Sequence, residues 1–514
     1  MTHKSCWEAP LGSLSGAAFA PLERDLTADV CVIGAGMAGL LTALELAERG
    51  RSVVVLEREG LAAGQTGATS AHLTTMLDTR YFELASIHGA EAARSIATSH
   101  MRGIAHLERV ANAYGIDCDF RRVSGFLCAN DEDQTEILRR EQKAATDAGI
   151  SCELVRRAPL SITAGPALHV PHQAEFDPLA FLAGVVRALQ RENVQLYAPV
   201  TVQSFDPVSA SDQIGLRTSV GRSIRANQVV VASNTPINDL VTMHTKQAPY
   251  RSYALSLAYA EPLPALCWDL EDPYHYVRSA RDANGRAILI VGGEDHKVGQ
   301  DADGERHWQR LEDWARERIP GAGNVLNRWS GQVLEPSDGI GFIGRNPGQE
   351  RVFIITGHSG NGMSYSALGA QLLADLAQGI ASPFESLYDP ARKPKALSAI
   401  GRFVRENLNV AEQYSDWLGP SDARLEDIAR GEGAVLRRGL KRVAVYVDLA
   451  GVAHEMSATC PHLKGVVSWN TAEKSWDCPC HGSRFDCYGK VLVGPAVSDL
   501  ERLIELRHKP AKAS

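Results

Sequence analysis

Residues 30–39 read Val-Cys-Val-Ile-Gly-Ala-Gly-Met-Ala-Gly, an apolar run followed by three glycines with the spacing GxGxxG. A continuous apolar run of this length is typical of a strand that is buried on both faces. The next residues, 40–48, are rich in Leu, Ala and Glu and predict a helix that ends at Gly50. Residues 53–56, Val-Val-Val-Leu, predict a second buried strand. Together these segments predict the βαβ unit that opens a doubly wound sheet of parallel strands.

Each glycine of this turn has its own expected role. Gly34 permits the tight turn, Gly36 lets the backbone approach a pyrophosphate, and Gly39 lets the helix pack on the strand. Glu57 ends the second strand, where an acidic side chain can bind ribose hydroxyls. A glycine-rich turn can serve packing alone, but the acid in this place favours a dinucleotide bound at the helix N-terminus.

Length and composition are those of an ordinary folded protein. The chain has 514 residues, enough for about three domains, and 44% of them are hydrophobic and 22% charged. Because no run of about 18 apolar residues is present, we expect no transmembrane segment. The net charge of −8, without a basic stripe, argues against a nucleic-acid partner. The first residues lack the apolar core of a secretory signal, so we expect a cytoplasmic protein.

Further along the chain, helical and strand patterns alternate. Amphipathic helices are predicted at 81–122, 132–147 and 178–191, buried strands at 194–197, 229–232 and 352–355, and alternating antiparallel strands at 250–260 and 287–292. A helix over 396–411 carries Ile400, Val404, Leu408 and Ala411 on one stripe, which favours a packing helix or spacer over a membrane-surface helix because its polar face is not strongly basic. These patterns predict parallel-sheet pieces interleaved with an antiparallel region, and then a small all-β domain.

Four of the ten cysteines lie close together near the C-terminus, at 460, 478, 480 and 487, which suggests a metal site. Cys460-Pro-His462 and Cys478-Pro-Cys-His481 form the pattern CxH…CxxH. Two thiolates and two imidazoles could hold zinc, but the CxH spacing is too short for the usual zinc-finger loop. Since each half supplies one Cys and one His, the pattern suits a binuclear cluster in which one iron takes both Cys and the other takes both His.

The surroundings of these ligands resemble the Rieske family over about residues 430–508. The resemblance rests on Leu463, Gly482-Ser483, Phe485-Asp486, Gly489 and Gly494-Pro495-Ala496. It implies a [2Fe-2S] cluster held by Cys460, His462, Cys478 and His481. Quinol-oxidising relatives have a second Cys where this chain has Lys464-Gly465, and a Tyr that bonds a ligand sulfur where it has Phe485. We therefore expect a cluster potential below that class.

Residues 29–390 resemble the D-amino-acid-oxidase-like (glycine/sarcosine oxidase) FAD-dependent oxidoreductases. The resemblance rests on the GxGxxG unit, on residues 64–72, 200–203 and 336–344, and on the late glycine-rich turn 355–363. It implies FAD rather than NAD. The expected FAD-binding residues are Gly34, Ala35, Gly36, Met37, Ala38, Gly39, Glu57, Arg58, Thr66, Thr69, Ser70, His72, Val202, Ala232, Gly357, Gly360, Asn361, Gly362 and Met363.

These resemblances predict the domain organisation. An irregular segment, 1–28, precedes the oxidoreductase domain, 29–390, and a helical linker, 391–425, leads to the Rieske domain, 426–508. Within the oxidoreductase domain, FAD binding falls mainly in 29–80, 194–236 and 335–380, and the substrate region mainly in 81–190 and 240–330. The expected fold is α/β, a Rossmann-like FAD-binding domain interleaved with an antiparallel-sheet substrate domain, plus an all-β Rieske domain.

The candidate catalytic and substrate-binding residues are His72, Tyr250, Arg251, Tyr253, Tyr276 and Arg278. An arginine fork suits a substrate carboxylate, although each residue could equally be an ordinary surface or core position. His72 could hydrogen-bond near the flavin ring, attach FAD covalently, or make no flavin contact. In the first two cases it could tune the flavin potential, since imidazole titrates near neutral pH.

The two resemblances together imply oxidation of a C–N bond in a small amine or amino acid. Electrons would pass from FAD to the cluster and on to an acceptor protein or quinone that the sequence does not name. An alternative is a reductase-like electron-transfer protein that supplies a separate oxygenase, which would need an NAD(P)H site; no second nucleotide motif is visible. A ring-hydroxylating oxygenase would need a further iron domain, and a redox sensor is a third alternative.

Overall fold

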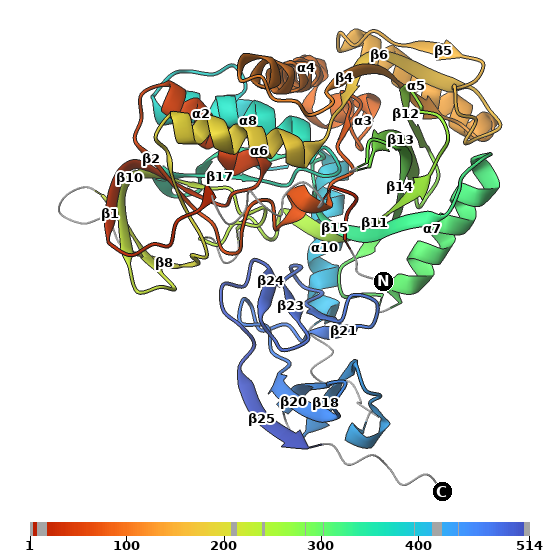
Figure 1. Ribbon diagram of the computed structural model, residues 1–514. Coiled ribbons are helices and arrows are strands. Elements are labelled where there is room, and N and C mark those ends of the chain that lie inside the picture. The colour runs from red at the N-terminus through yellow and green to blue at the C-terminus, as the bar shows by residue number, and fades with distance from the viewer. Residues whose placement is uncertain are drawn as a thin grey trace, which may run out of the picture.

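The computed structural model describes residues 4–7, 18–206, 213–238, 242–282, 284–301, 303–394, 396–413, 424–439 and 441–507. Two large sheets and two four-stranded sheets organise this part of the chain. Figure 1 shows the two large sheets side by side in the upper body and the two small sheets below them, with the C-terminus at the lower end.

The first large sheet contains the opening βαβ unit. Its strands lie in the order β16-β17-β10-β1-β2-β7, with β9 also paired to β10 and β8 to β9. The pairs among β17, β10, β1, β2 and β7 are parallel. The strands are β1 Leu26–Ile33, β2 Val53–Leu56, β7 Gln195–Tyr197, β8 Val202–Asp206, β9 Ile214–Thr218, β10 Ser223–Val231, β16 Phe342–Asn346 and β17 Gln349–Thr356.

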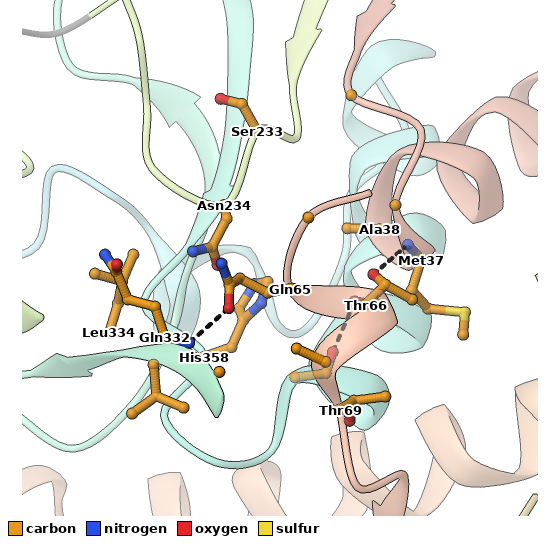
Figure 2. A pocket seen from close by; sticks show the side chains of 18 of the residues that line it. Met37, Ala38, Gln65, Thr66, Thr69, Ser233, Asn234, Gln332, Leu334 and His358 are labelled. Carbon is orange, nitrogen blue, oxygen red and sulfur yellow. Dashed lines mark hydrogen bonds between the residues drawn. The ribbon is translucent and has the colours of Figure 1, made fainter. Parts of the chain in front are cut away.

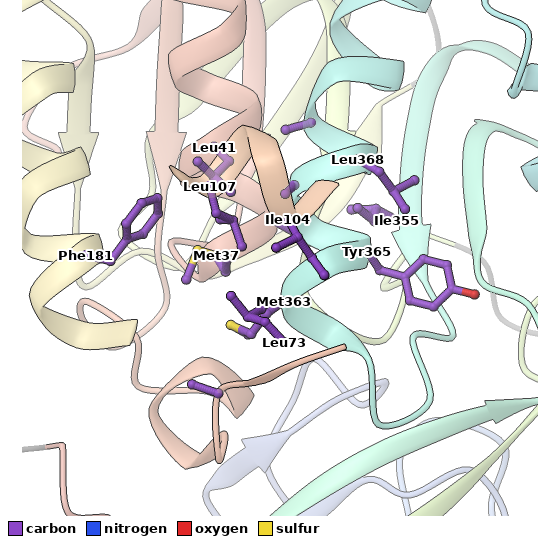
Figure 3. Close-up of a cluster of buried hydrophobic side chains, with 14 of the residues drawn as sticks. Met37, Leu41, Leu73, Ile104, Leu107, Phe181, Ile355, Met363, Tyr365 and Leu368 are labelled. Carbon is purple, nitrogen blue, oxygen red and sulfur yellow. The ribbon is translucent and has the colours of Figure 1, made fainter. Parts of the chain in front are cut away.

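Four helices, α2 (Met37–Glu48), α4 (Ala90–Ala113), α6 (Pro178–Arg191) and α8 (Gly362–Ala377), cover one face of this sheet. Their apolar side chains form the largest core, in which Leu41, Ile104, Leu107 and Leu368 are almost fully buried. Figure 3 shows this core between the helices, next to the N-terminal turn of α2 at Met37. The core thereby fixes the position of the glycine turn at the carboxyl end of β1, a central strand of the sheet.

The second large sheet is mainly antiparallel, in the order β15-β11-β14-β13-β12-β4-β6-β3, with β5 on β6. Its strands are β3 His72–Leu73, β4 Arg121–Cys128, β5 Glu153–Val155, β6 Ala167–Glu175, β11 Gln247–Ala258, β12 Ala265–Asp269, β13 His275–Arg281, β14 Ala287–Lys297 and β15 Val325–Pro336. Helices α3 (Tyr81–His88), α5 (Glu132–Asp147) and α7 (Gly304–Arg318) accompany it. The order of elements confirms the expected α/β class with an interleaved antiparallel region.

The C-terminal part is built from two small antiparallel sheets. One has the order β18-β19-β20-β25 and the other β21-β22-β23-β24. The strands are β18 Glu432–Arg438, β19 Lys441–Val447, β20 Val452–Ser457, β21 Ser468–Asn470, β22 Ser475–Asp477, β23 Arg484–Asp486, β24 Val491–Val493 and β25 Arg502–Arg507. The short elements that remain are η1 Gln65–Ala68, α9 Glu385–Tyr388 and η3 Leu425–Asp427.

Two expected elements differ from the structure. The expected helix 81–122 is two helices, α3 and α4, which are separated at Gly89; α4 ends at Ala113, and residues 121–122 belong to β4. The first strand starts at Leu26, before the expected Asp29, because residues 26–28 pair in parallel with 224–226 of β10. Residues 1–3 and 8–17 of the expected irregular N-terminal segment, and residues 395 and 414–423 of the expected linker, lie outside the described residues.

The expected helix of the linker is α10, Leu397–Gln413, but its apolar stripe does not pack as expected. Val404 is 47% exposed and Leu408 60% exposed. The polar face instead contacts the oxidoreductase domain, through an ion pair between Glu406 and Lys297 at 2.7 Å and a hydrogen bond from Asn407 to the carbonyl of Thr245. Within the described residues, no helix is long and apolar enough to cross a membrane.

Candidate active site and cluster site

A cavity of about 300 Å³ lies where the two large sheets meet the C-terminal domain. One wall is formed by the glycine turn, the end of β2 and η1; the other is formed by β11, β12, β13 and β15 of the antiparallel sheet. Figure 2 shows Met37, Thr66 and Thr69 on one wall and Gln332 and Leu334 on the other. The Gln65 side chain reaches across and accepts a hydrogen bond from the backbone N–H of Gln332.

The three glycines of the turn are needed for three different reasons. Gly34 has φ +108°, and a Cβ there would lie 2.6 Å from the carbonyl oxygen of Ala232. A Cβ on Gly39 would lie 2.0 Å from the carbonyl oxygen of Gly34, so this glycine serves the packing of α2 on β1. Gly36 has the ordinary extended conformation φ −85°, ψ −174°, and only the Thr66 side chain approaches its absent Cβ closely. Gly36 lines the cavity, so its missing side chain leaves room for a ligand.

Glu57 also lines the cavity, at the carboxyl end of β2. Its Oε2 accepts a hydrogen bond from the backbone N–H of Ala35 at 2.7 Å, and its Oε1 accepts one from Glu59 at 2.9 Å. These bonds hold the carboxylate beside the glycine turn, where a ribose would lie.

Residues 68–71, at the end of η1 and just after it, are held by three large side chains on the side away from the cavity. Trp329 donates to the carbonyl of Ala68 and Trp7 to that of Thr69. Arg278 donates to the carbonyls of Ser70 and Ala71 at 3.1 and 2.6 Å. This backbone is therefore anchored on its outer side, while Thr69 and Ser70 line the cavity on the other side.

Most of the expected FAD-binding residues lie together around this cavity. Those that line it are Gly34, Gly36, Met37, Ala38, Glu57, Arg58, Thr66, Thr69, Ser70, His72, Val202, Ala232, Gly360, Asn361, Gly362 and Met363. Ala35, Gly39 and Gly357 shape the turns behind them and are not among the lining residues. The space at Gly36 and the buried acceptor atom Asn361 Oδ1, which has no hydrogen-bond partner among the described residues, fit a bound dinucleotide.

His72 lies in the cavity wall, edge-on to Trp268 at 5.2 Å and to Tyr276 at 5.9 Å between ring centroids. Burial, together with the charge of Arg278, lowers the pKa of His72 to about 3. The ring is therefore neutral at neutral pH, and the expected tuning by gain or loss of its charge does not fit this geometry. Both ring nitrogens of His72 are buried, and neither has a hydrogen-bond partner in the part of the chain that the structure describes.

Several expected substrate-binding residues lie elsewhere, and these expectations are corrected. Tyr276 lines the cavity, but Tyr250, Arg251, Tyr253 and Arg278 do not. Tyr253 faces the opposite side of its sheet, where it stacks on the rings of His296 and His307. Arg278 is 2% exposed and is held by backbone carbonyls and by Glu175 at 3.4 Å, so it positions the wall rather than a substrate.

The four expected cluster ligands lie on two tight turns of the C-terminal domain. In one, the backbone N–H of Cys460 donates to Gly465; in the other, that of Cys478 donates to Ser483, both at 2.8 Å. The side chains of Cys460 and Cys478 contact each other. The rings of His462 and His481 lie 5.1 Å apart at 88°. This donor set fits a cluster with two thiolates on one iron and two imidazoles on the other.

The residues around the ligands agree with the departures noted in the sequence. A Cβ on Gly465 would lie 2.5 Å from Cys480 Sγ, so Gly465 stands where a second cysteine would bridge to Cys480. Phe485 is fully buried, and Ser483 lies beside Cys460 while its Oγ accepts from the backbone N–H of Ala496. Across the described ranges, no three His, Cys, Asp or Glu side chains converge as one metal ion requires. Each iron of a Rieske cluster takes two protein ligands.

The cluster turns are docked directly against the oxidoreductase domain. Gln332 donates through Nε2 to the carbonyl of Gly482, the residue after His481, at 3.1 Å. The ring of His244 lies 4.7 Å from that of His462. Residues 492–494, 496 and 497 of the C-terminal domain line the same cavity as the glycine turn. The two candidate sites therefore share a wall.

A buried ion-pair network fixes this docking. Glu473, in the loop between β21 and β22, accepts from Arg251 Nε at 2.9 Å and from Arg484 at 2.8 Å. The hydroxyl of Ser330, on β15, also donates to Glu473, and Arg484 also donates through Nε to Asp477. These charges hold the pKa of Glu473 well below its usual range. Arg251, expected at the substrate, thus belongs to the contact between domains.

We expect Glu473→Gln to destabilise the docked domain by about 3 kcal/mol, because it leaves two buried guanidinium groups poorly paired. Denaturant should release the cluster at a lower concentration, measured by its visible absorbance. Because the pKa of Glu473 is lower in the folded protein than in the unfolded chain, its carboxylate stabilises the folded state fully above the ordinary pKa of 4.5. This stabilisation is lost as the pH falls from 4.5 through the lower folded pKa. Glu432→Gln is the control, since Glu432 forms a more exposed pair with Lys474. Equal effects of the two variants would contradict the buried network.

The sequence did not point to several residues of these sites. Gln65, Asn234, Trp268, Gln332 and His358 line the cavity from five separate segments. His244, Glu473 and residues 492–497, at the end of β24 and after it, lie at the contact between domains. Gln65, His358 and residues 494–496 fall within segments that carry the two resemblances, but the sequence assigned them no individual role. No local motif marks the others, and only the fold brings them together.

The geometry defines the class of this protein: an oxidoreductase with a dinucleotide cavity and an adjoining Rieske-type ligand set. Comparison with known proteins agrees. The family model of FAD dependent oxidoreductases matches residues 29–376, and that of the Rieske [2Fe-2S] domain matches residues 421–504. The chain belongs to the FAD dependent oxidoreductase family and carries a Rieske domain; its cofactors are FAD and a [2Fe-2S] cluster.

Individual relatives cover one or both parts. A Bacillus subtilis (strain 168) protein named as a Rieske 2Fe-2S iron-sulfur protein, YhfW, is 28% identical over 94% of this chain and 95% of its own length. The gamma-glutamylputrescine oxidoreductase of Escherichia coli (strain K12) is 24% identical over 72% of this chain and 88% of its own. The solved structure of glycine oxidase from Geobacillus kaustophilus has a TM-score of 0.59 at 19% identity, over 72% of this chain and 99% of its own.

Proposed function

We propose that this enzyme oxidises a C–N bond of a small amine or amino acid at FAD and passes the electrons to its own Rieske cluster. From there they leave, one at a time, to an acceptor that is a protein or a quinone. The names of relatives support the substrate class: one is a gamma-glutamylputrescine oxidoreductase and another a glycine oxidase. The relative YhfW, which matches over nearly the whole chain, supports the pairing of the two parts.

The observation that carries the proposal is the shared wall. Gln332 lines the FAD cavity with its side chain and at the same time donates to Gly482, next to His481. The end of β24 and the residues after it, which follow the cluster turns, line the same cavity at 492–494, 496 and 497. Electrons therefore have a short, bonded route from the cavity to the histidine side of the cluster, with no domain movement.

The chain's own residues prepare the cavity for a neutral amine. Trp268, Tyr274 and Tyr276 form an aromatic wall, and His72 remains neutral beside them. The residues that line the cavity would hold FAD, which would supply a hydride acceptor for the carbon next to nitrogen, and the four cysteine and histidine ligands would hold the cluster, which would supply one-electron transfer. The amine also gives up an N–H proton, and the product is an imine, which water hydrolyses. Burial lowers the pKa of His358 to about 4, so this cavity-lining ring is neutral as well.

Anaerobic mixing of the holoenzyme with amines tests the proposal. We expect amines to bleach the flavin absorbance and then to produce the electron paramagnetic resonance signal of the reduced cluster. NADPH should do neither. Bleaching by NADPH but by no amine would instead favour the reductase-like alternative, and flavin reduction without any cluster signal would contradict transfer within the chain.

A further inference from the structure

The substrate end of the cavity, at β11, β13 and β15, has carboxylates rather than cationic side chains around it. The inference drawn from this charge rests on the proposed function and narrows its substrate class. Among the described residues that line the cavity, Arg58 is the only arginine or lysine. Arg58 follows Glu57 at the nucleotide end, where it donates to the carbonyl of Leu492. Arg251 and Arg278 are committed to partners outside the cavity. No guanidinium is therefore placed to pair with a substrate carboxylate.

Two carboxylates share one hydroxyl at this end. Ser359, which lines the cavity, lies with its Oγ 2.6 Å from Asp78 Oδ2 and 2.7 Å from Glu335 Oε1. Asp78 also lines the cavity and accepts from the backbone N–H of Gly360 at 2.7 Å. One hydroxyl proton serves only one of the two carboxylates. The other contact requires a further proton, or a cation nearby.

A third carboxylate approaches the same place from β14. Asp295 lies behind the cavity wall, where it contacts the lining residues Ser252 and Tyr274, and its buried Oδ1 has no hydrogen-bond partner among the described residues. Burial raises the pKa of the Tyr274 phenol, and the negative charges of all three carboxylates raise it further. Burial and mutual repulsion raise the pKa of Asp295 to about 7 and that of Glu335 to about 8. The cost of ionising them is relieved by an added positive charge.

Arg402 and His275 lie near these carboxylates, but neither lines the cavity. Arg402 of α10 lies near Glu335, donates through Nε to the carbonyl of Ser337 and pairs with Glu83 at 3.7 Å, and its buried Nη2 has no hydrogen-bond partner among the described residues. His275 lies near Asp295, but its ring is held between Asp269 and Glu294. A separate observation also favours a donor ligand: Gln332 is 3% exposed, its Nε2 is used by Gly482, and its Oε1 in the cavity has no partner.

We propose that the substrate is a di- or polyamine, held by a second ammonium group at Asp78, with Glu335 and Asp295 behind the cavity wall adding negative charge, while its other nitrogen is oxidised. The reacting nitrogen enters as the neutral amine. Its carbon would give a hydride to FAD and its nitrogen would give a proton to water, so that two electrons leave the C–N unit and an imine forms. The distal ammonium keeps its charge throughout. An α-amino acid would instead place its carboxylate beside three carboxylates.

Three amines with four carbon atoms each test the charge at the end of the substrate away from the reacting nitrogen: 1,4-diaminobutane, butylamine and 4-aminobutanoate. We expect anaerobic flavin reduction of the holoenzyme to have the lowest half-saturating concentration with the diamine and the highest with the amino acid. In Asp78→Asn or Glu335→Gln, the half-saturating concentration for the diamine should rise about 10- to 100-fold, while that for butylamine changes little. Asp147→Asn, an exposed site on α5, is the matched control.

The outcomes separate this inference from the proposed function. If 4-aminobutanoate or an α-amino acid reduces the flavin as well as the diamine, the inference is wrong although amine oxidation stands. The inference also fails if the diamine neither perturbs the flavin spectrum nor reduces it, or if Asp78→Asn affects butylamine and the diamine equally. Reduction by NADPH alone would overturn both.

Discussion

Gly36→Val is expected to weaken FAD binding by about 100-fold or more, the equivalent of about 3 kcal/mol, without disturbing the fold. The backbone at Gly36, with φ −85° and ψ −174°, is one that any residue adopts. The nearest atom to its absent Cβ is Thr66 Oγ1 at 3.0 Å, a side-chain atom that can move slightly, and no backbone atom lies within 4 Å. The space beside Gly36 opens into the cavity. A side chain there would occupy the place of the pyrophosphate.

Flavin content after purification and FAD titration of the apoprotein measure this loss, and circular dichroism checks the fold. Gly60→Val is the matched control, because nothing lies within 4 Å of its absent Cβ and it does not line the cavity. Gly39→Val should behave differently and lose the fold itself, since its Cβ would lie 2.0 Å from the carbonyl oxygen of Gly34. Full flavin content in Gly36→Val would mean that the pyrophosphate does not lie at this turn.

The glycine turn and the cluster ligands could be predicted because each is a local pattern. The spacing from Gly34 to Gly39 and from Cys478 to His481 determines the backbone turn and which atoms face the site. Glu57 follows from the length of one βαβ unit. For such patterns a short window of sequence contains most of the required geometry.

Residues on the antiparallel sheet could not be placed in this way. Nearly every position of β11 is at least half-buried, so the two-residue periodicity that would separate its faces is absent. A register shift between Arg251 and Tyr253 changes the alternation further. As a result Tyr253 faces α7 and Arg251 faces the Rieske domain, and neither reaches the cavity.

Contacts between the domains could not be predicted either, because their partners are distant in sequence. Arg251 and Glu473 are 222 residues apart, and Gln332 and Gly482 are 150 apart. A single acid or amide in a loop carries no signal of such a partner. These contacts nevertheless hold the histidine side of the cluster ligands against the flavin cavity, which is the arrangement on which the proposed function rests.

Cys460→Ser is expected to remove nearly all of the iron and sulfide, from two of each per chain, because it leaves one iron with a single thiolate. FAD should remain bound, since the glycine turn, Glu57 and η1 belong to the oxidoreductase domain. Amines should then still bleach the flavin under anaerobic conditions, but reduction of a one-electron dye in place of the natural acceptor should fall to background. His481→Ala should give the same pattern through loss of an imidazole.

Cys487→Ser is the control for this experiment, because Cys487 is a half-buried cysteine of the same domain that contacts Tyr446 and lies outside the ligand set. It should keep iron, sulfide and dye reduction. Since residues 492–497 form part of the flavin cavity, loss of the cluster should also shift the flavin spectrum without releasing FAD. If Cys460→Ser reduces the dye as fast as the unaltered chain, electrons leave directly from the flavin, and the shared wall has another purpose. If it loses FAD together with iron, the two sites depend on each other for folding rather than for electron transfer.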